Sequence, residues 1–120
     1  MPIGVVRSSL DRRTDAPRRP DDGPPAVLEI DERFAAALAG VEAGMDVFVI
    51  TWLHEAVRDV LQVRRPPTGV FATRSPDRPN PIGIHRVTIT AVDGTRVHVG
   101  ALEAIDGTPV LDLKPCIGNA

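Results

Sequence analysis

Two arginines and an asparagine stand close together on a proline-rich stretch in the middle of the chain. The stretch reads GVFATRSPDRPNPIG (residues 69–83) and holds Arg74, Arg78 and Asn80 among its prolines. Because proline fixes φ and lacks an amide donor, this stretch is predicted to be a stiff loop rather than a helix or a central strand. A guanidinium offers a planar fork to a carboxylate, a phosphate or a purine edge, and an amide both donates and accepts. The loop therefore either binds a polar ligand or is a solvated surface loop whose arginines pair with acidic side chains.

Other residues with acid–base chemistry lie outside this loop. His54 and Glu55 follow a strongly apolar run, where a histidine could act as a base or donate to a ligand. The alternative is a half-buried histidine bonded to the backbone. Asp106 and Asp112 flank the sequence GTPVL, which suits either turn chemistry or a ligand role. His54, Asp106 and Asp112 are the candidate general bases.

Several kinds of site are disfavoured by the sequence. Cys116 is the single cysteine, so no internal disulfide and no metal site with two or four cysteines can form, and no histidine pair has metal-ligand spacing. We therefore assign no metal. Ser8, Ser9 and Ser75 lack the histidine and aspartate pattern of a catalytic triad. No glycine-rich turn of the dinucleotide or phosphate-binding kind is present.

Length and composition indicate one small globular domain spanning residues 1–120. Apolar residues make up 42% of the 120 residues, aromatic residues only 3%, and the net charge is -2. This composition argues against a protein that stacks bases on aromatic side chains and against a broadly basic surface. The longest apolar stretch, VFVITWL (47–53), is too short to span a bilayer, and the N-terminus lacks the apolar core of a secretory signal. We expect a soluble, cytoplasmic protein that does not associate with membranes.

Hydrophobic alternation predicts a mainly antiparallel β-barrel or sandwich with one short helix and long loops. His85 and His98 fall at strand positions that could face solvent, and residues 55–63 fit either a helical turn or an extended segment. Asp93-Gly94 predicts a hairpin turn. The helix is expected at 31–40, with Asp31 as its N-cap. The predicted strands are 3–7, 26–30, 45–54, 69–73, 82–92, 96–104 and 110–114.

Four stretches, taken together in their order, resemble the TsaA-like family, whose characterised members include the TrmO tRNA methyltransferases. They are IGVVRS at the start, FVITWLHEA (48–56), the proline-rich stretch 69–83 and DGTPVLDLKP (106–115). The resemblance covers nearly the whole chain. It implies a small antiparallel β-barrel that binds S-adenosylmethionine and forms a homodimer with cofactor sites near the interface. It also implies methylation of the exocyclic amine of threonylcarbamoyl-adenosine in tRNA.

The resemblance also implies which residues contact the cofactor. Arg74 resembles the family's cofactor-contacting arginine, and Ile84 its apolar neighbour beyond the turn. His54 and Glu55 match a pair at the cofactor, where many relatives have glutamine in place of Glu55. Arg19 replaces the glutamine of the family's Pro-Arg-Gln motif in the first loop. The full set of expected cofactor-binding residues is Pro17, Arg18, Arg19, His54, Glu55, Arg74, Arg78, Asn80, Ile84, Glu103, Ala104, Ile105 and Asp106.

The methyl acceptor stays open at this point. Many TrmO proteins continue into a further C-terminal domain, whereas this chain ends at Ala120, and the first loop carries Asp21 and Asp22. An anionic tRNA needs several phosphate contacts, for which the loops offer basic residues. The alternatives are a methyltransferase acting on a small metabolite and a binding module without turnover. The basic residues available for tRNA are Arg18, Arg19, Arg64, Arg65 and Arg78.

Overall fold

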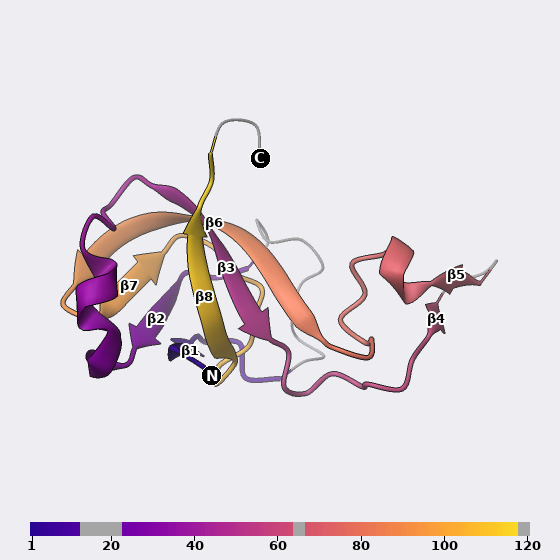
Figure 1. Cartoon of the computed structure of the whole chain (residues 1–120). Helices are drawn as coiled ribbons and strands as arrows, with labels where there is room; N and C mark the ends of the chain where they lie inside the picture. Colours follow the sequence, from indigo (N-terminus) through magenta and orange to yellow (C-terminus); the bar gives the residue numbers. More distant parts are fainter. Residues whose placement is uncertain (13–22, 64–66, 118–120) are drawn as a thin grey trace.

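Six strands close into an antiparallel barrel in the computed structural model, which describes residues 1–12, 23–63 and 67–117 (Figure 1). Around the barrel the strands follow the order β1-β2-β7-β6-β3-β8, and β8 returns to pair with β1 through Gly4 and Val110. The predicted β-barrel is therefore confirmed. The barrel strands are β1 (Gly4–Arg7), β2 (Ala26–Ile30), β3 (Asp46–Trp52), β6 (Ile82–Asp93), β7 (Arg96–Val99) and β8 (Pro109–Pro115).

Strand β6 shows how the sequence pattern builds the barrel wall. From Ile82 onward its residues alternate between exposed and buried up to Ile89, because successive side chains of a strand point to opposite faces. Val87 and Ile89 thus face the interior, and His85 lies in the same row. His85 is only 4% exposed, so the expectation that it faces solvent is wrong. The alternation that buries Val87 and Ile89 carries the imidazole inward as well.

Apolar side chains fill the barrel interior. Leu28, Val49, Val97 and Val110 are all fully buried, and they belong to one continuous core cluster. Small barrels filled in this way have a packed core rather than a ligand cavity. A cofactor must therefore bind at an end of the barrel or outside it.

One end of the barrel, which we call the capped end, is covered by the connection between β2 and β3. This connection contains the 3-10 helix η3 (Glu32–Leu38), and Asp31 caps it by accepting a hydrogen bond from the Arg33 amide at 3.0 Å. Phe34, Leu38, Val41 and Met45 pack against the core from this side. The β6–β7 turn lies at the same end, with Gly94 at a φ of 60°. The predicted helix and hairpin are thereby confirmed.

The other end, which we call the loop end, carries the three connections β1–β2, β3–β6 and β7–β8, because neighbouring strands run in opposite directions. The β3–β6 connection (53–81), here called the arm, extends away from the barrel (Figure 1). It contains β4 (Gln62–Val63), β5 (Thr68–Gly69) and the 3-10 turn η4 (Val70–Ala72).

Two predicted strands differ from the structure at the loop end. Residues 69–73 form a strand only as far as Gly69, because the Val70 carbonyl then accepts the Thr73 amide and closes a 3-10 turn. The strand predicted at 96–104 ends at Val99, since the chain turns away so that the Leu102 amide bonds to Pro24. Residues 55–63 form bends and turns before the short strand β4, not a helix.

Candidate functional site

Most of the predicted site residues lie on the two connections β3–β6 and β7–β8, which leave the barrel at the loop end. His54, Glu55, Arg74, Arg78 and Asn80 lie on the arm, and residues 103–106 lie on the β7–β8 connection. Ile84 is near the start of β6, at the base of the arm, and its side chain is 41% exposed. Pro17, Arg18 and Arg19 lie outside the described residues, as do Arg64 and Arg65.

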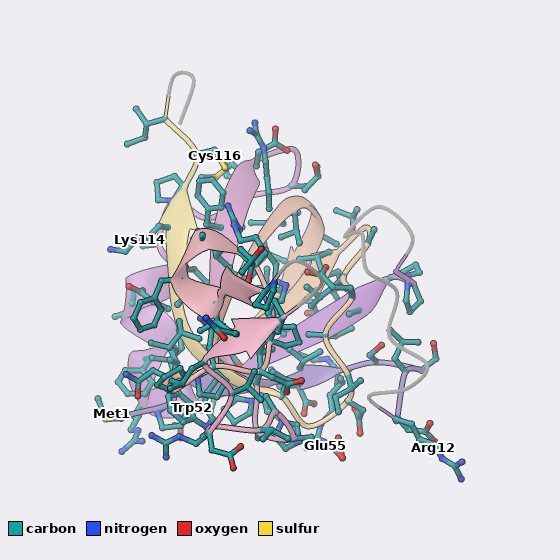
Figure 2. All side chains as sticks on the ribbon, turned by 90° about the vertical axis from the view of Figure 1, so that its right-hand side faces the viewer. Met1, Arg12, Trp52, Glu55, Lys114 and Cys116 are labelled. Atoms are coloured by element: carbon teal, nitrogen blue, oxygen red, sulfur yellow. The ribbon has the colours of Figure 1, made fainter. Side chains whose placement is uncertain are left out.

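His54 lies beside the β7–β8 connection. A Cβ placed on Gly107 would be 3.9 Å from His54 Nε2, so the imidazole borders the backbone next to Asp106. Gly107 has a φ of 85°, a left-handed conformation that favours glycine in this turn. His54 is exposed, and Glu55 beside it is exposed at the rim of the molecule, as Figure 2 shows from the side of the arm. The fold thus places His54 beside Gly107, on the connection that also carries Asp106.

Asp106 joins the β7–β8 connection to the end of β1. Its Oδ1 accepts the amide of Ser8 at 3.1 Å, and its own amide donates to the carbonyl of Leu10 at 2.5 Å. Arg7 lies 3.8 Å from the other carboxylate oxygen and donates to Glu29 at 2.8 Å. The hydrogen bond to Glu29, with a smaller contribution from Asp106, raises the pKa of the Arg7 guanidinium above its ordinary value. Asp106 is therefore held in one orientation at the loop end.

A buried hydrogen-bonded chain lies beneath the β7–β8 connection. His85 Nε2 is 2.7 Å from Thr51 Oγ1, and His85 Nδ1 is 2.5 Å from Glu103 Oε1. The second carboxylate oxygen, Glu103 Oε2, is buried and has no hydrogen-bond partner among the described residues. Glu103 was expected at the cofactor, whereas Thr51 and His85 were not. The period-2 alternation of residues 83, 85, 87 and 89 is the signal that could have placed His85 inside.

Arg78 holds the arm in shape. Its guanidinium donates to the carbonyls of Val70 at 3.0 Å, Thr73 at 3.0 Å and Ser75 at 3.2 Å. These bonds satisfy backbone acceptors that the prolines and the 3-10 turn leave without strand partners. Arg78 thus has a structural role here, and its contact with a cofactor stays a prediction.

Asn80 is engaged by a residue that the sequence analysis did not single out. Arg58 donates to the carbonyl of Pro79 at 2.9 Å and to Asn80 Oδ1 at 3.4 Å. Its guanidinium also lies 5.2 Å from the centre of the Trp52 ring, a cation–π distance. Arg58 therefore ties the last residues of the arm to the end of β3.

Arg74 is exposed and lines an open hollow of about 500 Å³ on the arm, together with Phe71, Ala72 and Thr73. The hydroxyl of Thr73 is already used, because it donates to Val70 and accepts the amide of Ser75. In this hollow Arg74 is the charged side chain that can meet an anionic group.

Asp112 and the pair Ala104 and Ile105 lie differently from the other predicted residues. Asp112 is exposed on β8, with Lys114 at 3.5 Å, and no contact seen in the described residues links it to His54 or Asp106. Ala104 and Ile105 are 4% and 8% exposed, so they offer little surface to a ligand. The base candidates on the connections at the loop end are therefore His54 and Asp106.

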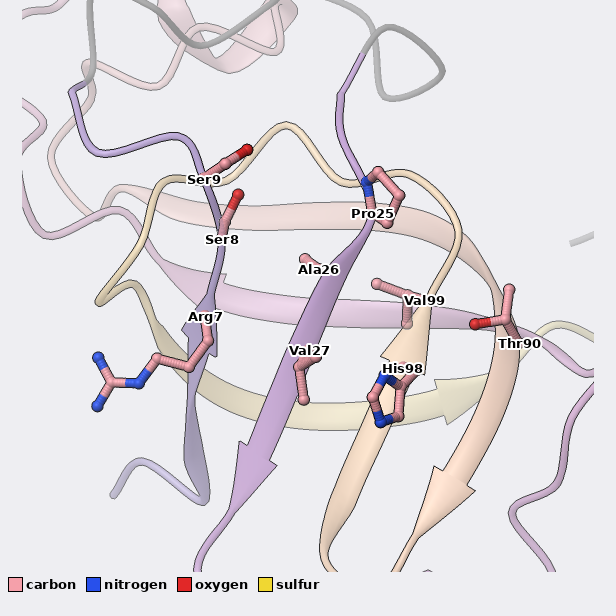
Figure 3. A pocket seen from close by; sticks show the side chains of 9 residues that line it. All are labelled: Arg7, Ser8, Ser9, Pro25, Ala26, Val27, Thr90, His98 and Val99. Atoms are coloured by element: carbon pink, nitrogen blue, oxygen red, sulfur yellow. The ribbon is translucent and has the colours of Figure 1, made fainter.

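A second hollow of about 290 Å³ lies over the ends of β1, β2 and β7. Figure 3 shows the Arg7 guanidinium directed away from the His98 imidazole, so the polar groups around this hollow do not converge on one point. Within the described ranges no cluster of His, Cys, Asp or Glu is placed to hold a metal ion, and no helix could cross a membrane.

Comparisons with known proteins agree on one family. An S-adenosyl-L-methionine-binding protein of Archaeoglobus fulgidus is 43% identical over 119 residues, which cover 94% of this chain and 85% of that protein. The crystal structure of TrmO from Pseudomonas aeruginosa is 34% identical with a TM-score of 0.80, and a second TrmO crystal structure is 36% identical with a TM-score of 0.81. The matches cover 99% and 97% of this chain but only 55% of each TrmO chain. Residues 5–120 match the family described as tRNA-methyltransferase O N-terminal domain, and the chain belongs to this family.

Proposed function

We propose that the chain binds S-adenosylmethionine at the loop end of the barrel and transfers its methyl group to an acceptor. The observation that carries the proposal is that His54 borders the β7–β8 connection, which carries Glu103 and Asp106. The barrel interior is filled, so the loop end is where polar groups are available to a ligand. The kinship with an S-adenosyl-L-methionine-binding protein and with TrmO supports the choice of cofactor.

The donor set fits the chemistry of this cofactor. Arg74 offers a charged fork for a carboxylate, and the buried, unpartnered oxygen of Glu103 offers an acceptor for hydroxyl or amino hydrogens. The Ile105 carbonyl already accepts the amide and the hydroxyl of Thr108, so the contact of Ala104 and Ile105 with an adenine edge stays a prediction. When bound, S-adenosylmethionine supplies an electrophilic methyl group on a sulfonium.

The chain's own residues would align the acceptor and take up its proton. A nitrogen or oxygen acceptor must lose a proton when it is methylated, and a base within hydrogen-bond reach can receive it. His54 is exposed beside Gly107, so its imidazole can meet an acceptor that approaches from solvent. Asp106 accepts the Ser8 amide and lies 3.8 Å from Arg7, so we propose that it orients the bound acceptor. We propose that His54 is the base that receives the proton.

We propose the exocyclic amine of threonylcarbamoyl-adenosine in tRNA as the acceptor, and this choice rests on the family. The chain spans about 55% of the length of the TrmO chains, and its net charge is -2. A small metabolite is therefore the second candidate, because an acidic protein gains little from long-range attraction to phosphates.

We also propose that two copies form a homodimer through the arm and the start of β6. Leu61 and Phe71 on the arm are 67% and 82% exposed, and Ile82 and Ile84 on β6 are 49% and 41% exposed. Exposed large apolar side chains that gather in one part of a surface often mark an interface. Light scattering at micromolar protein should give twice the mass of the chain, and a monomer mass in the presence of cofactor would contradict the dimer.

Incubation with S-adenosylmethionine labelled in its methyl group tests the function. Separate reactions would contain tRNA with threonylcarbamoyl-adenosine, the same tRNA without that modification, and a small-molecule extract. Label only in the modified tRNA supports the proposed acceptor, and label only in the extract supports the metabolite. Cofactor binding without transfer to either would leave a binding module and contradict the proposed activity.

A further inference from the structure

The buried polar groups of the barrel are concentrated at the loop end. Thr51 and His85 are 0% and 4% exposed, and they come from neighbouring strands β3 and β6. Glu103 reaches them from the β7–β8 connection, with an 18% exposed side chain. Buried polar side chains destabilise the fold unless they form hydrogen bonds with one another. Their presence here therefore suggests a role other than stability.

One protonation pattern gives Thr51, His85 and Glu103 a complete set of hydrogen bonds among themselves. The hydroxyl of Thr51 can donate its proton to His85 Nε2 at 2.7 Å, while the Nδ1 proton of a neutral imidazole is donated to Glu103 Oε1 at 2.5 Å. Each O–H and N–H hydrogen on these three side chains then has an acceptor, and the negative charge resides on the Glu103 carboxylate. The Glu103 carboxylate only accepts hydrogen bonds, so it favours the tautomer with the proton on Nδ1, and Thr51 completes this arrangement by donating to Nε2.

The imidazole has little freedom to leave this arrangement. Gly83 pairs with Thr51 in the β3–β6 ladder, and a Cβ at Gly83 would lie 2.5 Å from Thr51 Oγ1 and 2.7 Å from His85 Nε2. The glycine therefore makes room for the two side chains to meet above it. The backbone that carries Thr51 and His85 belongs to paired barrel strands, so it is rigid in comparison with a loop.

The carboxylate of Glu103 is held by one oxygen only. Oε1 is bonded to His85, whereas Oε2 is buried and has no partner among the described residues. A buried carboxylate oxygen without a donor is costly, and a ligand hydroxyl or amino group would remove that cost. The neighbouring backbone is fixed as well, because the Leu102 amide donates to Pro24 at 3.0 Å.

We infer that His85 is a positioning residue, which holds the Glu103 carboxylate so that Oε2 accepts a hydroxyl or amino hydrogen of the cofactor. This inference rests on the proposed function, because it takes S-adenosylmethionine as the ligand at the loop end. His85 itself does not touch the ligand in this account. It acts from beneath the β7–β8 connection, through Glu103.

Two substitutions of His85 separate positioning from general packing. In His85→Asn the side-chain amide nitrogen takes the place of Nδ1 and keeps a donor for Glu103. In His85→Gln the longer amide takes the place of Nε2, so the contact with Thr51 is kept and the donor to Glu103 is lost. The two variants remove similar amounts of buried ring. Calorimetric titration of the full chain with S-adenosylmethionine should give an affinity within about threefold of the wild type for His85→Asn and a loss of about tenfold or more for His85→Gln.

A cofactor-free measurement supports the same test. The His85 Nδ1 proton, in a short bond to a carboxylate, should give a proton NMR resonance far downfield of the amide region in the wild type. Glu103→Gln should remove this resonance and weaken cofactor binding. Thr51→Val, which nearly keeps the side-chain shape, should shift the resonance and weaken binding less than His85→Gln does. This variant also serves if either His85 variant does not fold.

The outcomes distinguish the inference from the proposed function. If the wild type binds no S-adenosylmethionine, both are wrong. If it binds, and folded His85→Gln binds equally well while Glu103→Gln does not, only the positioning role is wrong. Equal losses of affinity in His85→Asn and His85→Gln, in step with equal losses of thermal stability, would also overturn it, because His85 would then serve packing alone.

Discussion

The capped end of the barrel is covered by the apolar side chains Phe34, Leu38, Val41 and Met45, whereas the loop end holds the buried polar residues Thr51, His85 and Thr108. Both ends close the same strands, yet among the described residues the buried polar side chains lie at the loop end. Apolar side chains stabilise the barrel when they are buried, whereas buried polar groups lower the free energy of unfolding unless they are hydrogen-bonded. This difference agrees with the proposal that the ligand binds at the loop end.

The largest effect is expected in the barrel between the two ends. Leu28 is fully buried on β2, so Leu28→Ala removes apolar contacts and leaves a cavity. The free energy of unfolding should fall by about 2–5 kcal/mol, as measured by urea denaturation. A loss below about 1 kcal/mol would mean that the interior is not packed as the structure has it.

A substitution at the loop end should affect binding instead. Arg74→Ala should weaken S-adenosylmethionine binding by roughly 1.5–3 kcal/mol, because a charge-assisted hydrogen bond is lost. Arg33→Ala is the matched control, since Arg33 is an exposed arginine at the capped end that pairs with Asp31. Calorimetry should show unchanged affinity for the control. Equal affinities for the two folded variants would remove Arg74 from the site.

The arm should depend on Arg78 more than the barrel does. Arg78→Ala leaves three carbonyls of the arm without their guanidinium donor, so the arm should open more readily by about 1–2 kcal/mol. Hydrogen exchange of the backbone amides at positions 73 and 78 should become faster, while amides of β6 and β7 keep their protection. Unchanged exchange at Thr73 would show that the hydrogen bonds of the Arg78 guanidinium do not hold the arm in shape.

The smallest effect on the site is expected from the capped end. Phe34 is only partly buried, so Phe34→Ala should cost about 1–2 kcal/mol of stability, less than a fully buried phenylalanine. Cofactor affinity should not change, because the barrel core separates Phe34 from the loop end. A clear loss of affinity in this variant would show that the two ends are coupled.

Local patterns predicted much of the barrel but not its closure. Alternation placed strands β2 and β6 closely, and Asp93-Gly94 placed the hairpin, because these signals act over a few residues. Pairing of Gly4 with Val110 closes the barrel across almost the entire chain, and no local pattern encodes such a contact. The resemblance to the family, not periodicity, supplied that expectation.

The site was predicted unevenly for the same reason. The proline-rich stretch 69–83 indicated a rigid loop. Which three carbonyls Arg78 binds is set by the path of the arm in space, which the sequence does not show. The sequence left His85 at a strand position that could face solvent, whereas in the structure it lies in the same buried row as Val87 and Ile89. Its partner Glu103 belongs to a distant connection, so the buried chain becomes visible only in the fold.

The most direct test of the account compares hydrogen exchange along the chain with and without S-adenosylmethionine. The cofactor should slow exchange in the arm and in residues 100–108, while residues 31–45 and the turn at Gly94 exchange as before. This pattern would place the ligand at the loop end, where His54 borders the connection that carries Glu103 and Asp106. Slower exchange at the capped end, with none in the arm or in residues 100–108, would contradict the central claim.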